Sequence, residues 1–486
     1  MIKKIKHTSW FILVLLALAQ FMVVLDSSIV NVMLPTVQKA FTISESNLQW
    51  IITAYTLTFG GFLLLGGRAA DLFGRRKVFI IGVTVFTIAS FIDGIAFSSN
   101  MLIIIRAIQG LAGAFMSPAA LSIVLVTYKE GHDRNLALSV WGAVAAGGAA
   151  IGVLLGGIIT QYLGWRWNFF INVPIGIFVV ISALKVLPKH ESEEINSNLD
   201  LPGALSVTAS LILLVYGLVE APTSGWTSHS SLLYFGLSAL LMLYFVINEF
   251  RTKHPLMPMS IFKIRNVSGA NIIQLMMAAS LFSIFFFVTL YVQDILGYSP
   301  VKTGVSFLVI PLIIIITAAN APRLIRKIGY KPILIITPLF TATGLYLLSS
   351  MHVGGSYINN ILPGLVVMGL GLGFTFVTIL VTATTGIAPH LSGLASGLVN
   401  TAQQLGGSIG LAVLTGIAAS DTNHYLRTIH HLTRLSPLEG EVHGFQLALR
   451  VAVGFAIASS IIAIFVIKQR KVSAEDIKSA MQTSAG

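Results

Sequence analysis

Apolar stretches long enough to cross a lipid bilayer recur along this chain of 486 residues with almost no interruption. The hydrocarbon core of a bilayer is about 30 Å thick, which a helix crosses with about 20 apolar residues. Only 10% of the residues are charged, whereas a soluble domain carries about 25%. The sequence therefore predicts an all-α integral membrane protein. Its fourteen predicted spans are 10–35, 47–68, 78–97, 101–127, 136–160, 168–187, 202–219, 231–249, 267–292, 304–322, 332–350, 359–384, 392–419 and 445–467.

The distribution of basic residues predicts the orientation of these spans. The formal net charge of +12 would suggest a nucleic-acid partner in a soluble protein. Here, 23 of the 30 Lys and Arg residues fall at the two ends and in alternate loops, five fall in the opposite loops, and Arg106 and Arg450 fall within spans. Because cytoplasmic loops carry an excess of Lys and Arg, we expect a multi-pass protein of the cell (cytoplasmic) membrane with both termini inside, and no nucleic-acid partner.

A degenerate internal repeat indicates how the spans are grouped. The loop 67–77 (GRAADLFGRRK) has a counterpart at 322–331 (PRLIRKIGYK), with the same seven-residue interval between the first and last marker residues. Such repeats are typical of secondary transporters. We therefore expect two pseudo-symmetric six-helix bundles at 1–187 and 261–467, separated by a linker and two inserted helices at 188–260 and followed by a cytoplasmic tail at 468–486.

Three ionisable residues fall at one level inside the predicted membrane layer. Asp26 lies about 24 Å from the inner end of its span at about 1.5 Å per residue, and Asp93 and Arg106 lie at a similar depth. A charge there costs at least about 2.5–3.5 kcal/mol, so such residues pair, line an aqueous cavity or move protons. We predict a proton-coupling site at Asp26, Arg106 and Asp93. Asp93 precedes Gly94 near the end of its span and fits a capping role equally well.

The loop 67–77 combines turn-forming glycines with charges of both signs. Positive charge alone would anchor the loop on the cytoplasmic side, but it does not account for Asp71 among three arginines. We expect an ion-pair cluster that holds one state of a gate. The expected gating residues are Gly67, Arg68, Asp71, Gly74, Arg75 and Arg76.

The span 136–160 carries glycines at intervals of four residues. Small residues on one helix face allow close packing in membranes, and we expect either plain packing or sliding during gating at Gly148, Gly152, Gly156 and Gly157. The span 392–419 is also rich in glycine, and it carries the amides of Asn400, Gln403 and Gln404. These amides either bind a substrate or tie helices together.

No enzyme or metal-binding motif in the sequence has the surroundings that its chemistry requires. The run 406–410 (GGSIG) matches a nucleophile elbow, but it falls inside a predicted spanning helix. No phosphate-binding glycine loop ending in Lys-Ser/Thr is present, so ATP is excluded as the energy source. The driving force is then an ion gradient, for which protons are expected, or the substrate's own gradient, and no cofactor is expected. The loop 420–444 contains four histidines, at 424, 430, 431 and 443, without a carboxylate at ligand spacing. A solvated loop rather than a metal site is predicted there.

Several of these motifs together resemble a known family. The loop 67–77 is similar to the loop signature of the major facilitator superfamily, with Ala69 where Leu is usual. The runs 25–35 (LDSSIVNVMLP), 106–110 (RAIQG) and 165–176 (WRWNFFINVPIG) resemble its fourteen-helix drug/proton antiporter branch. The resemblance implies that Asp26 and Arg106 take part in proton coupling and that the 67–77 loop stabilises the outward-open state. One departure is Val153, where the antiporter motif usually has Pro.

The expected function is export of small amphipathic compounds in exchange for protons by alternating access, with the chain acting as a monomer. A proton-coupled importer or facilitator of a metabolite is the alternative, which Val153 allows, and a non-transporting sensor is disfavoured because no soluble domain is predicted. The expected cavity residues, each equally compatible with ordinary packing, are Met22, Asn31, Tyr55, Gln109, Asn271, Gln274, Phe285, Tyr291, Asn400 and Gln404.

Overall fold

The computed structural model describes residues 2–128, 132–188, 199–253, 255–387, 391–429 and 435–470, and all regular structure in these ranges is helical. The first bundle consists of α1 (Ile2–Phe41), α2 (Glu45–Leu48), α3 (Trp50–Phe73), α4 (Arg75–Gly94), α5 (Ser99–Thr127), α6 (His132–Tyr162), α7 (Trp167–Phe170) and α8 (Asn172–Val186). Two further helices follow, α9 (Leu201–Ser224) and α10 (His229–Arg251).

The second bundle begins after the 3₁₀ turn η1 (Met259–Lys263). It consists of α11 (Arg265–Leu290), the π-helical turn η2 (Tyr291–Ile295), α12 (Pro300–Phe307), α13 (Val309–Ile328), α14 (Tyr330–Leu348), the π-helical turn η3 (Tyr357–Ile361), α15 (Leu362–Thr384), α16 (Ser392–Thr428) and α17 (Ser436–Phe465). Fourteen helical segments in the described ranges are long and apolar enough to cross a membrane, as the sequence predicts.

The region predicted as a solvated loop at 420–444 is largely helical, which corrects that prediction. Helix α16 continues to Thr428 and α17 starts at Ser436. The two extensions pack closely, because a Cβ added at Gly444 would lie 2.4 Å from the carbonyl oxygen of Ala418. The predicted linker at 188–200 falls mostly outside the described residues.

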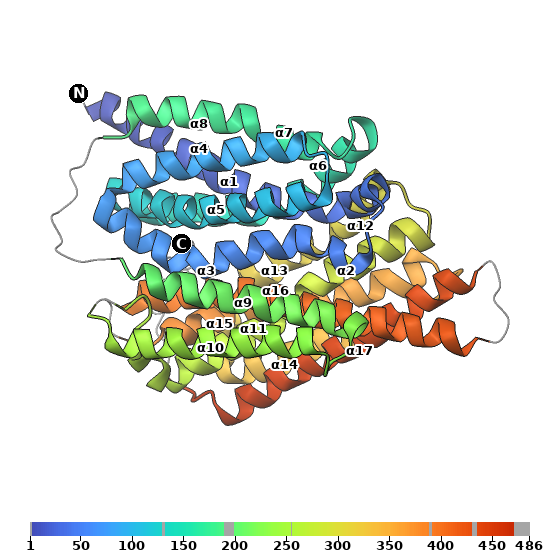
Figure 1. The fold of residues 1–486 in the computed structure, drawn as a ribbon. Helices are drawn as coiled ribbons and strands as arrows, with labels where there is room; N and C mark the ends of the chain where they lie inside the picture. Colours follow the sequence, from blue (N-terminus) through green and yellow to red (C-terminus); the bar gives the residue numbers. More distant parts are fainter. Residues whose placement is uncertain are drawn as a thin grey trace.

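The spanning helices run along a common direction, with α1–α8 on one side of the molecule and α11–α17 on the other (Figure 1). The first residues of α1 and the last residues of α17 lie at the same end of the bundle, which we call the terminal end; the opposite end is the distal end (Figure 1).

The two inserted helices occupy one flank of the seam between the bundles (Figure 1). Helix α9 contacts the first bundle through Thr208, whose Oγ1 would lie 2.4 Å from a Cβ added at Gly61 of α3. It contacts the second bundle through Pro222, whose Cγ would lie 3.1 Å from a Cβ added at Gly416 of α16. Helix α10 covers the outer side of α9 and exposes large apolar side chains such as Leu240, as a helix facing lipid does.

The internal repeat has a structural counterpart in two tight turns. Gly74 joins α3 to α4 with φ of 91°, and Gly329 joins α13 to α14 with φ of 82°. Residues with a side chain rarely adopt this left-handed region, whereas glycine does so without steric cost. The matching glycines therefore join equivalent helix pairs in the two bundles.

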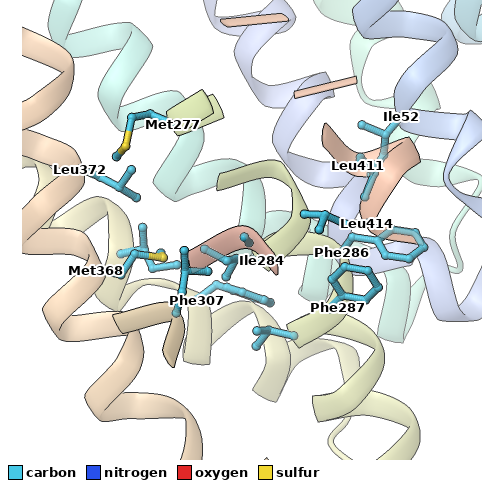
Figure 2. Packing of buried hydrophobic residues seen from close by; sticks show 14 of the residues in the cluster. Ile52, Met277, Ile284, Phe286, Phe287, Phe307, Met368, Leu372, Leu411 and Leu414 are labelled. Carbon is cyan, nitrogen blue, oxygen red and sulfur yellow. The ribbon is translucent and has the colours of Figure 1, made fainter. Parts of the chain in front are cut away.

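Buried apolar side chains hold each bundle together and also cross the seam between the bundles. One cluster, which includes Phe79, Phe86 and Trp141, belongs to the first bundle. A larger cluster includes Ile52 of α3 together with Leu411 of α16, so it spans both bundles (Figure 2).

Candidate functional site

Two oppositely charged side chains meet inside the first bundle. Asp26 lies on α1 and Arg106 lies on α5, with 0% and 1% of their side chains exposed, and Nη1 of Arg106 donates to Oδ2 of Asp26. The sequence predicts only that these residues share one level of the membrane, and the structure brings them into contact. A buried ion pair persists when further hydrogen bonds satisfy its remaining polar atoms.

Neutral polar side chains provide those bonds around Asp26. Nε2 of Gln109 and Nδ2 of Asn172 donate to its Oδ1 at 2.9 Å and 3.1 Å. Both amides also donate to Oγ of Ser90, at 3.3 Å and 3.1 Å respectively. Four helices, α1, α4, α5 and α8, thus converge on one polar site. We call it the Asp26 network, and its members are Asp26, Ser90, Arg106, Gln109 and Asn172.

The guanidinium of Arg106 is held from three further directions. Its Nε donates to the carbonyl oxygen of Ile51 at 3.1 Å, and its Nη1 donates to Oε1 of Gln109 at 2.6 Å. Its Cζ lies 4.3 Å from the centroid of the Tyr55 ring, within the range of a cation–π interaction. This proximity depends on Gly110, because a Cβ there would lie 2.2 Å from the carbonyl oxygen of Tyr55.

Glycines on α6 set the position of α1, the helix that carries Asp26. A Cβ added at Gly152 would lie 2.6 Å from Cβ of Ser28, and one added at Gly156 would lie 2.9 Å from the carbonyl oxygen of Ile29. Gly148 contacts Val24 of the same helix, where an added Cβ would lie 3.2 Å from Cγ1. The predicted small-residue face therefore lies against α1.

The same helix reaches the second bundle near its distal end. A Cβ added at Gly157 would lie 2.4 Å from the carbonyl oxygen of Pro300 in α12. In the opposite direction, a Cβ added at Gly304 would lie 2.4 Å from the carbonyl oxygen of Val153. Val153, which replaces the usual Pro, thus lies in a close contact between the two bundles.

Polar contacts also join the bundles at the distal end. Nζ of Lys39 lies 2.8 Å from Oδ1 of Asp294, and Nε2 of Gln293 donates to the carbonyl oxygen of Val32 at 2.8 Å. Together with the α6–α12 contacts, these interactions hold the distal ends of the two bundles against each other.

Asp93, the third ionisable residue predicted in the site, does not join the pair. It is 0% exposed on α4, and neither carboxylate oxygen has a hydrogen-bond partner among the described residues. It lies within electrostatic range of both Arg106 and Asp26. Ser90 of the Asp26 network precedes it by three residues on the same helix, which places both on one helix face.

The predicted gating loop 67–77 is helical on both sides of Gly74, and among the described residues it forms one ion pair rather than the predicted cluster. Asp71 accepts from Nη2 of Arg75 at 3.2 Å, and both side chains are exposed. Arg76 instead donates to the carbonyl oxygen of Leu184 on α8 at 2.8 Å. The third arginine, Arg68, donates to a backbone carbonyl in the segment before η1. Arg68 lies on α3, whereas Arg75 and Arg76 are the first two residues of α4 and, as successive residues, project in different directions.

The residues predicted to line a cavity separate into two groups. Met22, Gln109 and Tyr291 are 0% exposed, so in this conformation they do not line an open space, which corrects the prediction. Tyr291 donates instead to the carbonyl oxygen of His352 at 2.8 Å. Tyr55 and Gln274 are only 1% exposed. The partly exposed members of the predicted set are Asn31, Asn271, Phe285, Asn400 and Gln404.

Two amides of the predicted cavity set in the second bundle, Gln274 and Asn271, bond to another amide or to their own helix. Nε2 of Gln274 on α11 donates to Oε1 of Gln403 on α16 at 3.1 Å, and Nδ2 of Asn271 donates to the carbonyl oxygen of Val267 at 2.8 Å. The hydrogen bond between α11 and α16 favours the second of the two predicted roles of Gln403, which is to tie helices together rather than to bind a substrate.

The described residues contain no cluster of three or more side chains suited to a metal ion. His443 pairs with Asp421 between the extensions of α16 and α17, while His430 and His431 lie outside the described residues. Two carboxylic acids and one arginine at the buried site can exchange protons and partners, which is chemistry suited to coupling. Ser90 and Asn172 were not predicted as site residues, since an uncharged polar residue within a span gives a weak signal.

Comparison with known proteins identifies the family of this chain. The sequence model of the Major Facilitator Superfamily matches residues 16–411. The chain therefore belongs to the Major Facilitator Superfamily, a family of membrane transporters, and it is a multi-pass membrane protein with fourteen apolar helices.

Several of its curated relatives are named for resistance or export. The chain is 37% identical to the puromycin resistance protein pur8 of Streptomyces alboniger over 479 residues, which cover 98% of this chain and 95% of that protein. It is 37% identical to the cephamycin export protein CmcT of Amycolatopsis lactamdurans over 414 residues, 85% of each chain.

Solved structures share the fold at low sequence identity. The peptide transporter-family protein PepTSo has a TM-score of 0.70 at 14% identity, with 95% of this chain and 97% of that chain covered. A bacterial homologue of the human lysosomal transporter Spinster has a TM-score of 0.68 at 13% identity, with 94% and 97% covered. The predicted fold, two six-helix bundles with two inserted helices, is thus confirmed.

Proposed function

We propose that this chain is a secondary active efflux transporter that exports small amphipathic compounds in exchange for protons. The observation that carries the proposal is the buried Asp26–Arg106 pair inside a fourteen-span transporter. Relatives named for puromycin resistance and cephamycin export support the direction of transport and the class of compound.

Asp26 is the proposed proton acceptor. Its carboxylate is the charge partner of Arg106, and a proton bound to it would remove that partner. A change in the Asp26 network would act directly on α1, which packs along the glycines of α6. Proton binding is therefore linked to the packing of α1, and this linkage is what coupling requires.

The conformation favours a cavity that opens at the terminal end. Lys39, Asp294 and the Gly157–Pro300 contact close the distal end. We propose that the terminal end faces the cytoplasm, since most basic residues lie there. In this orientation the substrate binds from inside and leaves outside as Asp26 gains a proton, which is released inside after the bundles rock back.

The remaining parts of the proposal concern organisation. We place the bundle boundaries at residues 187 and 261, with Gly74 and Gly329 at equivalent turns on either side. The transport unit is a monomer, because the Asp26 network is completed by helices of one chain. The partly exposed Phe285, Asn400 and Gln404 offer the apolar and amide groups that an amphipathic compound binds.

A susceptibility panel in a host that lacks its own efflux pumps tests the function. Expression of the wild-type chain should raise resistance to a subset of amphipathic antibiotics, whereas Asp26→Asn at equal expression should not. Transport in proteoliposomes with an imposed pH gradient then tests direction. Net uptake driven in the opposite direction, with substrate following the proton, would identify an importer and contradict the proposal.

A further inference from the structure

Asp93 is a buried acid that the Asp26–Arg106 pair leaves unexplained. Its side chain is 0% exposed, and both carboxylate oxygens lack a hydrogen-bond partner among the described residues. An isolated carboxylate in an apolar interior is costly unless it is neutralised by a proton or a counter-charge. By contrast, the carboxylate of Asp26 accepts hydrogen bonds from three residues.

A capping role does not account for this placement. The C-cap of α4 is Ile95, whose backbone N–H bonds to the backbone oxygens of Ile92 and Asp93. The carboxylate of Asp93 accepts none of these bonds, and it does not reach solvent, since the residue is fully buried. Its side chain therefore contributes neither to the helix end nor to the surface.

The charged groups around Asp93 belong to the proposed coupling site. Arg106 of α5 and Asp26 of α1 lie within electrostatic range of it. Tyr55 of α3 lies against Arg106, and Arg166, before α7, donates to the carbonyl oxygen of Ala96 just beyond the end of α4. The uncharged Asn172 of α8 donates to Ser90, which lies three residues before Asp93 on α4. Arg106 is thus the counter-charge that two acids can share.

Position along the helices gives the two acids different access. Asp93 is one residue from the distal end of α4, which ends at Gly94. Asp26 lies in the middle of α1, which runs from Ile2 to Phe41. Ser90, which accepts from the same two amides as Asp26, precedes Asp93 by three residues on α4, so Asp93 lies about one helical turn nearer the distal end than the Asp26 network. A small movement at the distal end would therefore expose Asp93 before Asp26.

We propose that Asp93 takes up the proton from the distal side and passes it to Asp26, while Arg106 moves from the carboxylate of Asp26 to that of Asp93. This inference rests on the proposed proton coupling. One O–H bond breaks at Asp93 and one forms at Asp26, and Arg106 follows the negative charge. The site therefore holds one proton, one carboxylate and one guanidinium before and after the transfer, so no net charge is created in the membrane.

The test uses Asp93→Asn, which keeps the size of the side chain but cannot release a proton. In proteoliposomes, proton-driven efflux should fall by roughly tenfold or more, since a positioned proton donor contributes at least about 10²-fold in favourable cases. Substrate exchange without a gradient should be affected much less. Its fold-reduction should be at most one tenth of the fold-reduction in proton-driven efflux. The dependence of efflux on the distal pH should flatten, and Asp93→Glu should restore it.

Glu220→Gln is the matched control, because Glu220 lies near the distal end of α9 and bonds there to Ser224. It should retain the wild-type pH dependence. If Asp93→Asn keeps that dependence while Asp26→Asn abolishes coupling, the relay is wrong and the proposed function stands. If exchange and driven efflux fall equally and Asp93→Glu rescues neither, Asp93 is structural and the relay is again wrong. If wild-type transport ignores the proton gradient, the proposed function itself fails.

Discussion

Arg106 on α5 donates to Asp26 on α1 at a point where both side chains are almost completely buried. This contact joins two residues that are 80 positions apart in the sequence. Both helices belong to the first bundle, so the contact can form or break without any change in the second. The proton chemistry of the proposed cycle is therefore confined to the first bundle. Movement of α1 is the means by which the effect of protonation is transmitted to the second bundle.

Replacement of Asp26 by Asn should remove coupling without unfolding the protein. The amide keeps the size of the side chain and can still bond to its neighbours, but it cannot bind or release a proton at physiological pH. Proton-driven efflux in vesicles should fall by about 10²-fold, while the apparent melting temperature in detergent stays close to that of the wild type. Undiminished driven efflux from this variant would refute the assignment of Asp26.

Replacement of Gly157 by Ala should destabilise the closed distal end. The new Cβ would lie 2.4 Å from the carbonyl oxygen of Pro300, and overpacking of this kind costs about 1–3 kcal/mol. The chain contains no cysteine, so cysteines introduced at Lys39 and Asp294 report distal closure through their yield with a short bifunctional maleimide. That yield should fall in the variant.

Gly147→Ala is the matched control on the same helix, because nothing lies within 4 Å of a Cβ added there. Its crosslinking yield should equal that of the wild type. Equal yields in both variants would show that Gly157 does not govern the distal contact.

Replacement of Gly74 by Ala should strain the α3–α4 turn. An L-residue at its φ of 91° costs about 1–2 kcal/mol in a left-handed conformation. The apparent melting temperature should fall by a few degrees, about 2–4 °C per kcal/mol for a large domain. Gly67→Ala, on α3 before this turn, is the control: its added Cβ would have its nearest contact at 3.7 Å, and the melting temperature should stay unchanged. A larger effect from Gly67→Ala would contradict this account.

Replacement of Asp71 by Asn should slow turnover more than it weakens substrate binding. Its pair with Arg75 is exposed, so it contributes about 1 kcal/mol or less to any state, and high salt should reproduce much of the effect. Asp133→Asn, at an exposed acid near the same end, serves as the control. A pure loss of affinity in Asp71→Asn would indicate that the loop only anchors the chain.

The fourteen spans were predictable because each is an apolar run of the length that a bilayer requires. The extensions of α16 to Thr428 and of α17 from Ser436 were not, since polar helices outside the membrane lack that signal. Asp26 and Arg106 stood out because charge is scarce inside the spans. Their contact with Ser90 and Asn172 depends on helix rotation and packing, which one sequence does not specify.

The predicted cavity shows the same limit more clearly. Met22 and Tyr291 carry the apolar and aromatic groups expected of a drug-binding surface, but both are fully buried in this conformation. Their residue types are common to cores and cavities alike. Only the packing of neighbouring helices decides between the two.

The inserted pair α9–α10 determines the direction in which the helices of the second bundle cross the membrane. Two crossings bring the chain back to the side of the membrane from which it left, so the insertion preserves the parity of every later span. For this reason Gly74 and Gly329 can form the same turn at the same end of the molecule although two extra helices separate their bundles. An insertion of one or three helices would have turned the second bundle upside down, whereas a pair changes only the flank on which it packs.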